Sequence, residues 1–215
     1  IDSFRHVADV RACMARYTIV LEPSCSGLAI PAVLAWTAYA PECVVVMAGA
    51  AADRRLLTGL GSNLVPVAIG TDAWADATVF RPLGRPHRRY GAVAVARAHV
   101  EKRLLLLFRA IALLSDPDFR LALILGGRPS PERHLVAQWI RWYHLDRQVD
   151  VLEGLSPEQM NACYNDAKVN VLLSRQEGGS RAVTEGLLAG TPALLTAEHV
   201  STITRDRVVP STGPV

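Results

Sequence analysis

The chain has 215 residues, of which 50% are hydrophobic and 20% are charged. This composition excludes a disordered tail, a collagen-like chain and a low-complexity chain. Its 23 Lys and Arg residues and 20 Asp and Glu residues give a formal net charge of +3, too balanced for a general nucleic-acid-binding protein. Lys102 and Lys168 are the only lysines. Arginine suits phosphate and carboxylate groups, although an arginine-rich composition can equally reflect genomic base bias.

Short runs of β-branched residues alternate with helical patterns in the first third of the chain. The expected strands are residues 17–21, 43–47 and 64–68, and the expected helices are residues 30–40 and 51–60. Pro66 has no backbone N–H, so it predicts that its strand lies at a sheet edge or that the strand ends there. The apolar stretch at residues 27–40 is interrupted by Pro31 and is shorter than the ~20 residues of a membrane span.

Residues 71–90 contain Pro82 and Pro86 with little periodicity, and they are the expected linker. After this segment the alternation begins again and is more regular. The expected strands are residues 92–96, 121–125, 149–152, 169–173 and 193–195, and the expected helices are residues 99–115 and 131–144, one from 157 and one from 180. Ser156 and Gln159 have the spacing of a capping box at the start of a helix.

Continuous apolar strands separated by helices of ten or more residues are typical of parallel sheets covered on both faces. The sequence therefore predicts an α/β fold with two parallel-sheet units. We place the first unit at residues 1–70, the linker at 71–90 and the second unit at 91–215. Both ends of the chain look cut, so the first unit is expected to be incomplete and the second to be truncated at its end.

Charged residues and glycines follow the first two strands of the second unit, where parallel sheets bind ligands. Arg97 directly follows the expected strand at 92–96, and Lys102 lies in the first turn of the expected next helix. A lysine at that position is mildly disfavoured by the helix dipole, which hints at a bound anion; the alternative is a solvated turn without function. Gly126 and Gly127 either let a ligand approach the backbone or simply end their strand.

The most informative segment is residues 174–192, SRQEGGSRAVTEGLLAGTP. A strand ends there, two glycines make a tight loop, and a helix begins near Ser180, where free backbone N–H groups suit a phosphate. Glu177 lies before this helix and Glu185 lies in its second turn. One carboxylate could accept hydrogen bonds from sugar hydroxyls and the other from ribose hydroxyls. The alternative for Glu185 is an ordinary surface position on the helix.

The segment from Val169 to Leu195 resembles the donor-binding segment of family-4-type (group 1) retaining glycosyltransferases of the GT-B fold. The signature of that family is Glu, seven residues, Glu, then a small residue, Gly, Thr or Val, and Pro. The similarity extends over about residues 64–215. It implies a GT-B-like fold of two Rossmann-like units. The first would be the end of the acceptor-side domain, and the second would bind the nucleotide sugar.

The resemblance implies a role for each residue that matches the family's motif. Arg97 and Lys102 would neutralise the donor diphosphate as the sugar leaves, and Glu177 would contact the donor sugar. These three are the expected catalytic residues, while Glu185 would bind the nucleotide ribose. The other expected donor-binding residues are Gly126, Gly127, Gly178, Gly179, Ser180 and Arg181. No metal or other cofactor is expected, since the family needs none and Asp116-Pro117-Asp118 lies at the opposite edge of the sheet.

The sequence also departs from the family's pattern. Residues 178–181, Gly-Gly-Ser-Arg, stand where Gly-Phe-Gly-Leu is commoner, and Ala96 replaces the glycine that usually precedes the arginine. Residues 1–70 are about half the length expected of the family's amino-terminal domain, and none of the 6 histidines stands at the acceptor-side catalytic position. The chain is therefore expected to be an internal fragment of a larger enzyme.

The expected function is transfer of a sugar from a nucleoside diphosphate sugar to an acceptor hydroxyl, in polysaccharide or glycoconjugate biosynthesis. The resemblance alone implies retention of configuration. The acceptor, whether a glycan, a lipid-linked molecule or a small molecule, is not identified, and no nucleic-acid partner is expected. The alternatives are a non-catalytic nucleotide-binding module or fragment, and another GT-B enzyme such as a sugar-nucleotide epimerase or a phosphorylase. Four cysteines without a CxxC pair favour a cytoplasmic location, either free or at the periphery of the inner membrane.

Overall fold

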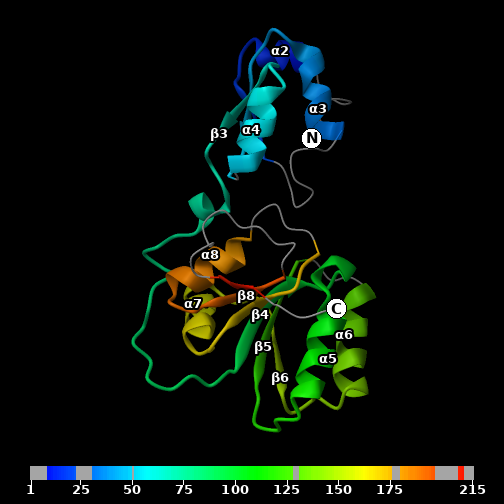
Figure 1. Cartoon of the computed structure of the whole chain (residues 1–215), viewed down its shortest axis with the longest axis vertical. Coiled ribbons are helices and arrows are strands. Elements are labelled where there is room, and N and C mark those ends of the chain that lie inside the picture. Colours follow the sequence, from blue (N-terminus) through cyan, green and yellow to red (C-terminus); the bar gives the residue numbers. More distant parts are fainter. Residues whose placement is uncertain are drawn as a thin grey trace. The chain divides into compact units, whose positions relative to one another are not determined.

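The computed structural model describes residues 9–22, 31–49, 51–127, 131–175, 180–196 and 208–210. Its contacts divide the chain into two compact units, the first containing the chain up to Trp74 and the second most of the chain from Ala75 onward (Figure 1). Each unit is built around its own parallel sheet, which confirms the predicted α/β class.

The described strands of the first unit form a parallel sheet in the order β1-β2-β3. They are β1 (Ile19–Leu21), β2 (Val44–Met47) and β3 (Leu64–Val67), accompanied by α2 (Val10–Met14), α3 (Pro31–Leu34), the 3-10 turn η1 (Ala35–Tyr39), α4 (Ala51–Gly59) and the 3-10 turn η2 (Thr71–Trp74). Trp36 and Val44 are almost fully buried in the core of this unit. Pro66 lies in β3, which ends the described strand order, so the edge position predicted from this proline is confirmed.

The described residues of the second unit form six parallel strands in the order β6-β5-β4-β7-β8-β9. They are β4 (Ala92–Arg97), β5 (Leu121–Gly126), β6 (Val149–Leu152), β7 (Asn170–Leu172), β8 (Ala193–Leu195) and β9 (Val208–Pro210). The chain first builds outward from β4 to β6 and then returns to place β7 on the other side of β4. Such a reversal of strand order is the point where open parallel sheets bind their ligands, beyond the carboxyl ends of the strands.

Alternate residues of the central strands pack on opposite faces of this sheet, as the two-residue period of a strand requires. Ala94 and Leu123 face the helices α5 (Leu104–Leu114) and α6 (Pro131–Trp142). Val93 and Ile124 face Tyr164, on the opposite side of the sheet. Figure 1 shows α5 and α6 together on one side, and α7 (Pro157–Asn165) and α8 (Arg181–Leu188) on the other. The predicted cover on both faces is confirmed.

The start of α7 has the predicted capping box. The Ser156 hydroxyl accepts a hydrogen bond from the Gln159 backbone N–H at 3.3 Å, and the Gln159 side chain accepts one from the Ser156 N–H at 2.8 Å. These two bonds satisfy backbone donors that a helix start otherwise leaves unpaired.

The expected continuous helix at residues 99–115 is wrong. A 3-10 turn, η3 (Val100–Lys102), comes first, Arg103 adopts a left-handed conformation with φ of 49°, and α5 begins only at Leu104. The His99 side chain caps the turn by accepting from the Glu101 N–H. Lys102 therefore lies before the helix, and the argument from the helix dipole does not apply to it.

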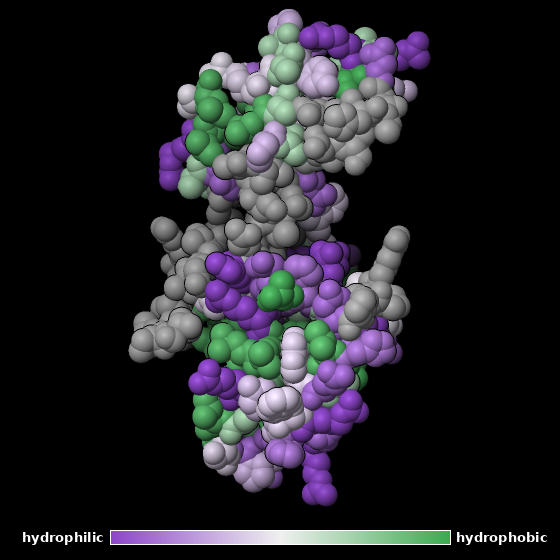
Figure 2. All heavy atoms as spheres, turned by 90° about the vertical axis from the view of Figure 1, so that its right-hand side faces the viewer, coloured by the Kyte–Doolittle hydropathy of each residue, from purple (hydrophilic) through white to green (hydrophobic). Residues whose placement is uncertain are grey.

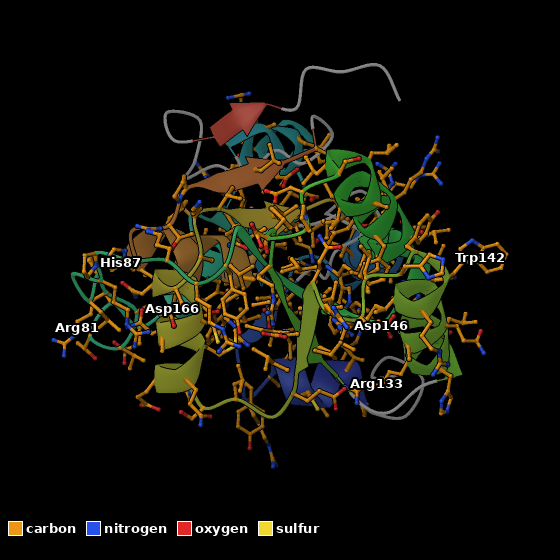
Figure 3. The ribbon with its side chains drawn as sticks, turned by 90° about the horizontal axis from the view of Figure 1, so that it is seen from below. Arg81, His87, Arg133, Trp142, Asp146 and Asp166 are labelled. Atoms are coloured by element: carbon orange, nitrogen blue, oxygen red, sulfur yellow. The ribbon has the colours of Figure 1, made fainter. Side chains whose placement is uncertain are left out.

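Two buried asparagines of α7 bind the segment that precedes the second sheet. Asn161 Oδ1 accepts a hydrogen bond from the Arg81 N–H at 3.1 Å, and Asn165 Oδ1 accepts one from the Leu83 N–H at 2.7 Å. The Asn165 amide also donates to the Arg81 carbonyl at 3.0 Å. Figure 3 shows Arg81 beside α7, which ends near Asp166. Part of the expected linker is thus fixed to the second unit.

Exposed hydrophobic side chains lie among hydrophilic ones on the face that carries α5 and α6 (Figure 2). Trp142 at the end of α6 is 79% exposed and points away from the body of the unit (Figure 3). No helix among the described residues is long and apolar enough to cross a membrane.

Candidate functional site

Arg97 and the glycine pair of β5 lie together at the carboxyl edge of the second sheet. Arg97 is the last residue of β4 and is in register with Gly126, the last residue of β5. Gly127 follows with φ of +85°, and a Cβ there would lie 3.0 Å from the Cγ and Cδ atoms of Arg97. The positive φ favours glycine, and a side chain there would also push Arg97 aside by a few tenths of an ångström. The exposed Arg97 side chain thus packs against a turn whose residues, Gly126 and Gly127, have no side chains.

Arg133 at the start of α6 contacts this glycine turn. Its Nη2 donates to the Gly127 carbonyl at 3.3 Å, and its Nη1 lies 2.8 Å from Glu153 Oε2. Figure 3 shows Arg133 near the edge strand β6. Arg133 therefore links the glycine turn to the segment after β6.

The turn that holds Lys102 is joined to the loop after β7. The Arg175 backbone N–H donates to the Glu101 carbonyl at 2.9 Å. Because β4 and β7 are neighbours in the sheet, this bond connects the two loops at the point where the strand order reverses. Lys102 is half-buried in η3, and Arg175 is exposed.

Helix α8 packs very closely on β7. The Asn170 side-chain amide donates to the Ala182 carbonyl at 2.8 Å. A Cβ on Gly186 would lie 2.6 Å from Asn170 Nδ2, so only glycine permits this approach. The position of α8, and of every residue on it, is thus fixed by the sheet.

Glu185 is buried on α8, and both of its carboxylate oxygens have partners. The Tyr164 hydroxyl donates to Oε2 at 3.1 Å, and Nε of Arg181 lies 3.1 Å from Oε1. Burial raises the pKa of Glu185, and the Tyr164 hydrogen bond and the Arg181 charge oppose that rise without cancelling it. Burial also raises the pKa of Tyr164 well above its ordinary value, so this phenol stays protonated and remains a donor. The alternative of an ordinary surface position for Glu185 is wrong.

The structure brings the sequence-predicted site residues together in three groups. Arg97 lies with Gly126 and Gly127, the Lys102 turn lies with the loop after β7, and Arg181 pairs with Glu185. All of these follow the carboxyl ends of β4, β5 and β7. Ser180 is buried directly before α8. Glu177, Gly178 and Gly179 lie outside the described residues.

Sequence reasoning missed four residues that shape this edge, namely Arg133, Tyr164, Asn170 and Gly186. Tyr164 falls on the inward face of the predicted helix from 157, so its burial could have been predicted, but its partner on α8 could not. Asn170 is a polar residue inside an apolar strand, which is a signal of a specific hydrogen bond.

The opposite, amino edge of the same sheet carries a different cluster of charges. Asp150 on β6 accepts hydrogen bonds from the Tyr90 hydroxyl at 2.9 Å, from Arg89 at 2.9 Å and from Arg120 at 2.7 Å. Burial alone would raise the pKa of Asp150, but the hydrogen bonds from Tyr90 and Arg120 and the charges of Arg120 and Arg89 hold it below its usual value. Burial and the bond to Asp150 raise the pKa of Tyr90 to about 12.

Asp116-Pro117-Asp118 lies between α5 and β5, at the amino edge, as predicted. The Asp118 N–H donates to Asp116 Oδ1 at 3.0 Å, a local turn bond. Among the residues that the structure describes, no group of three or more His, Cys, Asp or Glu side chains could hold a metal ion.

The second unit is a doubly wound parallel α/β domain with its candidate site at the switch point of the sheet. Residues 76–202 match the family model described as glycosyl transferases group 1. The chain therefore belongs to this family, as the resemblance predicted. A comparison with curated proteins finds no match.

Several solved structures have a similar fold. Sucrose-phosphate synthase from Thermosynechococcus elongatus has a TM-score of 0.61 and 20% identity, over 77% of this chain and 44% of that chain. Anabaena Alr3699/HepE in complex with UDP and glucose has a TM-score of 0.65 and 15% identity, over 87% of this chain and 55% of that chain. The pneumococcal O-GlcNAc transferase GtfA in complex with UDP and GlcNAc has a TM-score of 0.60 and 15% identity, over 78% of this chain and 34% of that chain. The chain thus spans about a third to a half of the length of these structures, which share the predicted GT-B fold.

Proposed function

We propose that this chain carries the nucleotide-sugar-binding part of a glycosyltransferase that moves a sugar from a nucleoside diphosphate sugar to an acceptor hydroxyl, with retention of configuration. The observation that carries the proposal is the family match at residues 76–202, which falls on the unit whose switch-point edge gathers Arg97, the Lys102 turn and Glu185. Two neighbours of the same fold were solved with UDP and a sugar, which supports a nucleoside diphosphate ligand.

Arg97 and Lys102 would bind the diphosphate in this proposal. Their charges would neutralise the leaving group as its bond to the sugar breaks, which is the main electrostatic demand of the reaction. Gly127 leaves room for the Arg97 side chain, and the Arg175–Glu101 backbone bond fixes the Lys102 turn. Two cations of this kind can stabilise a diphosphate without a metal ion.

The two glutamates would bind the two sugars of the donor. Glu185 would accept hydrogen bonds from the ribose hydroxyls, and Tyr164 would hold its carboxylate in the orientation that this requires. Glu177 would contact the transferred sugar. Backbone N–H groups of residues 178–181, before and at the start of α8, would bind the distal phosphate.

The two lysines of the chain provide a matched test. UDP, GDP and ADP, with their nucleosides, are titrated calorimetrically into the chain and into its Lys102→Ala and Lys168→Ala variants. Lys168 is exposed at the amino edge, where its backbone N–H donates to the Tyr90 carbonyl, a bond that alanine keeps. Lys102→Ala should weaken diphosphate binding about 10- to 100-fold, the effect of losing one charge-assisted hydrogen bond.

Nucleoside affinity should stay the same in both lysine variants, and Lys168→Ala should change neither ligand. Equal losses for nucleoside and diphosphate in Lys102→Ala would contradict a phosphate role. A chain that binds none of the three diphosphates would contradict the proposed function itself. In the full-length enzyme, Glu177→Gln should lower transfer by orders of magnitude, and normal activity would exclude the role of Glu177.

A further inference from the structure

Arg181 is one of the residues at this edge that depart from the family's pattern. Its position more often carries leucine, which cannot pair with a carboxylate. In this chain the i,i+4 spacing along α8 places the Arg181 guanidinium over the Glu185 side chain, with Nε 3.1 Å from Oε1. The proposed ribose-binding carboxylate is therefore already occupied by a cation.

The two partners of Glu185 differ in how free they are to move. Tyr164 is fully buried and donates to Oε2 from the core side. The Arg181 side chain is 66% exposed, whereas the Glu185 side chain is 8% exposed. Burial holds the tyrosine in place, whereas the exposed Arg181 side chain is free to adopt another rotamer.

We infer that Arg181 is a placeholder that exchanges partners when the donor binds, an inference that rests on the proposed function. The ribose hydroxyls take over Glu185 Oε1, and the released guanidinium turns to the diphosphate. Arg181 then acts as a specificity-determining residue, because it favours ligands that carry phosphate over nucleosides that do not.

The exchange agrees with the strengths of the interactions involved. The Arg181 side chain is 66% exposed and regains water when the pair opens, whereas the buried Glu185 carboxylate has to receive the ribose hydroxyls in place of the guanidinium. A guanidinium bound to a diphosphate makes parallel charge-assisted hydrogen bonds, which are much stronger. The backbone need not move, since α8 is anchored to β7 by the Asn170–Ala182 bond and by the close approach at Gly186.

The test is the Arg181→Leu variant of the chain, which restores the residue of the family's pattern. The diphosphate that the chain prefers among UDP, GDP and ADP is titrated by calorimetry, and its nucleoside by NMR. Diphosphate affinity should fall about tenfold or more, because one phosphate contact is lost. Nucleoside affinity should rise about two- to fivefold, because the hydroxyls no longer displace an ion pair.

Three controls isolate the exchange. The 2′,3′-dideoxynucleoside has no hydroxyls for Glu185, so Arg181→Leu should not improve its binding. Arg109→Leu replaces an exposed arginine on α5 and should change no affinity. Arg181→Gln should repeat the result of Arg181→Leu, which excludes a folding defect peculiar to leucine.

The outcomes separate the inference from the proposed function. A diphosphate that binds the parent chain, together with unchanged affinities in Arg181→Leu, overturns the inference and leaves the proposed function standing. Loss of diphosphate affinity without a gain for the nucleoside also overturns it, since Arg181 would then bind phosphate without having covered Glu185. Failure of every diphosphate to bind the parent chain overturns both.

Discussion

The two edges of the six-stranded sheet use the same residue types in opposite ways. At the amino edge, Asp150 accepts from Tyr90, Arg89 and Arg120, so the charges neutralise one another within the fold. At the carboxyl edge, Arg181 pairs with the buried Glu185, and Arg97 at the end of β4 is exposed. Asp150 therefore has two charged partners, whereas Glu185 has one.

The carboxylates at the two edges also differ in the direction of their pKa shifts. Donors around Asp150 hold its pKa below the usual value, so its ionised form stabilises the folded state. Burial raises the pKa of Glu185, so its ionised form costs the folded state free energy. A carboxylate whose ionised form is unfavourable in the fold, such as Glu185, is a candidate functional residue.

The largest expected effect is on stability at the amino edge. Asp150→Ala leaves two guanidinium groups and the Tyr90 hydroxyl without their shared acceptor, and should lower the free energy of unfolding by about 2–3 kcal/mol. Urea denaturation measures this loss. Asp118→Ala, at an exposed aspartate of the same edge, should stay within about 0.5 kcal/mol of the parent chain. Below the unfolding transition, Asp150→Ala should bind nucleoside diphosphates normally; a parallel loss of binding would break the comparison.

An intermediate effect is expected at the glycine turn of the carboxyl edge. Gly127→Ala and Gly154→Ala both place a side chain at positive φ, +85° and +64°, and each should cost about 1 kcal/mol of stability. Only at Gly127 would the new Cβ meet Arg97, since nothing lies within 4 Å at Gly154. Calorimetry should show weaker diphosphate binding for Gly127→Ala alone. Equal diphosphate affinities of the two variants would contradict a role of Arg97 in diphosphate binding.

The smallest expected effect is the pH dependence of stability, which should have opposite signs at the two edges. Asp150 has a folded-state pKa below 3.8, so its contribution is present above about pH 4 and is lost as the pH falls through the folded value. Glu185 has a folded-state pKa above 4.5, so its contribution is present at lower pH and is lost as the pH rises through the folded value.

Thermal unfolding between pH 3 and pH 8 tests these signs with two amide variants. Asp150→Asn should be less stable than the parent chain at pH 7, and the difference should shrink below pH 4. Glu185→Gln should raise the Tm at pH 7 by about 1–3 °C and lose that advantage below about pH 5. If Glu185→Gln is less stable than the parent chain at pH 7, the ionised Glu185 stabilises the fold, as the ionised Asp150 does.

The spacing of apolar residues was sufficient to predict most strands and helices of the second unit, because each element buries apolar side chains at the regular spacing of a strand or a helix. The strand at 149–152 and the strand at 193–195 have their predicted bounds. The break at Arg103 was not predictable, since an uninterrupted run of leucines continues the helical pattern and only the His99 cap and a left-handed arginine separate the turn from the helix.

In the candidate site, too, the positions of single residues could be predicted from the local sequence, but their tertiary partners could not. Arg97 and Glu185 were expected at the end of a strand and in the second turn of a helix, where they lie. Lys102 was expected in the first turn of a helix but lies in the 3-10 turn before it. The partner of Glu185 could not be predicted, because Tyr164 and Glu185 are 21 residues apart and meet only when α7 and α8 pack on the same face of the sheet. A tyrosine in an amphipathic helix predicts burial but not the atom that its hydroxyl reaches.

The asparagines of α7 have a practical consequence for cutting this domain out of the chain. A boundary at residue 91, where the second unit was expected to begin, would remove the peptide groups that satisfy Asn161 and Asn165, and would strip Phe80 from the ring of Tyr164, 6.1 Å away between centroids. Tyr164 donates a hydrogen bond to Glu185, so such an excision would also loosen the Glu185 carboxylate. An excised domain that keeps its ligand-binding geometry has to start at or before Phe80.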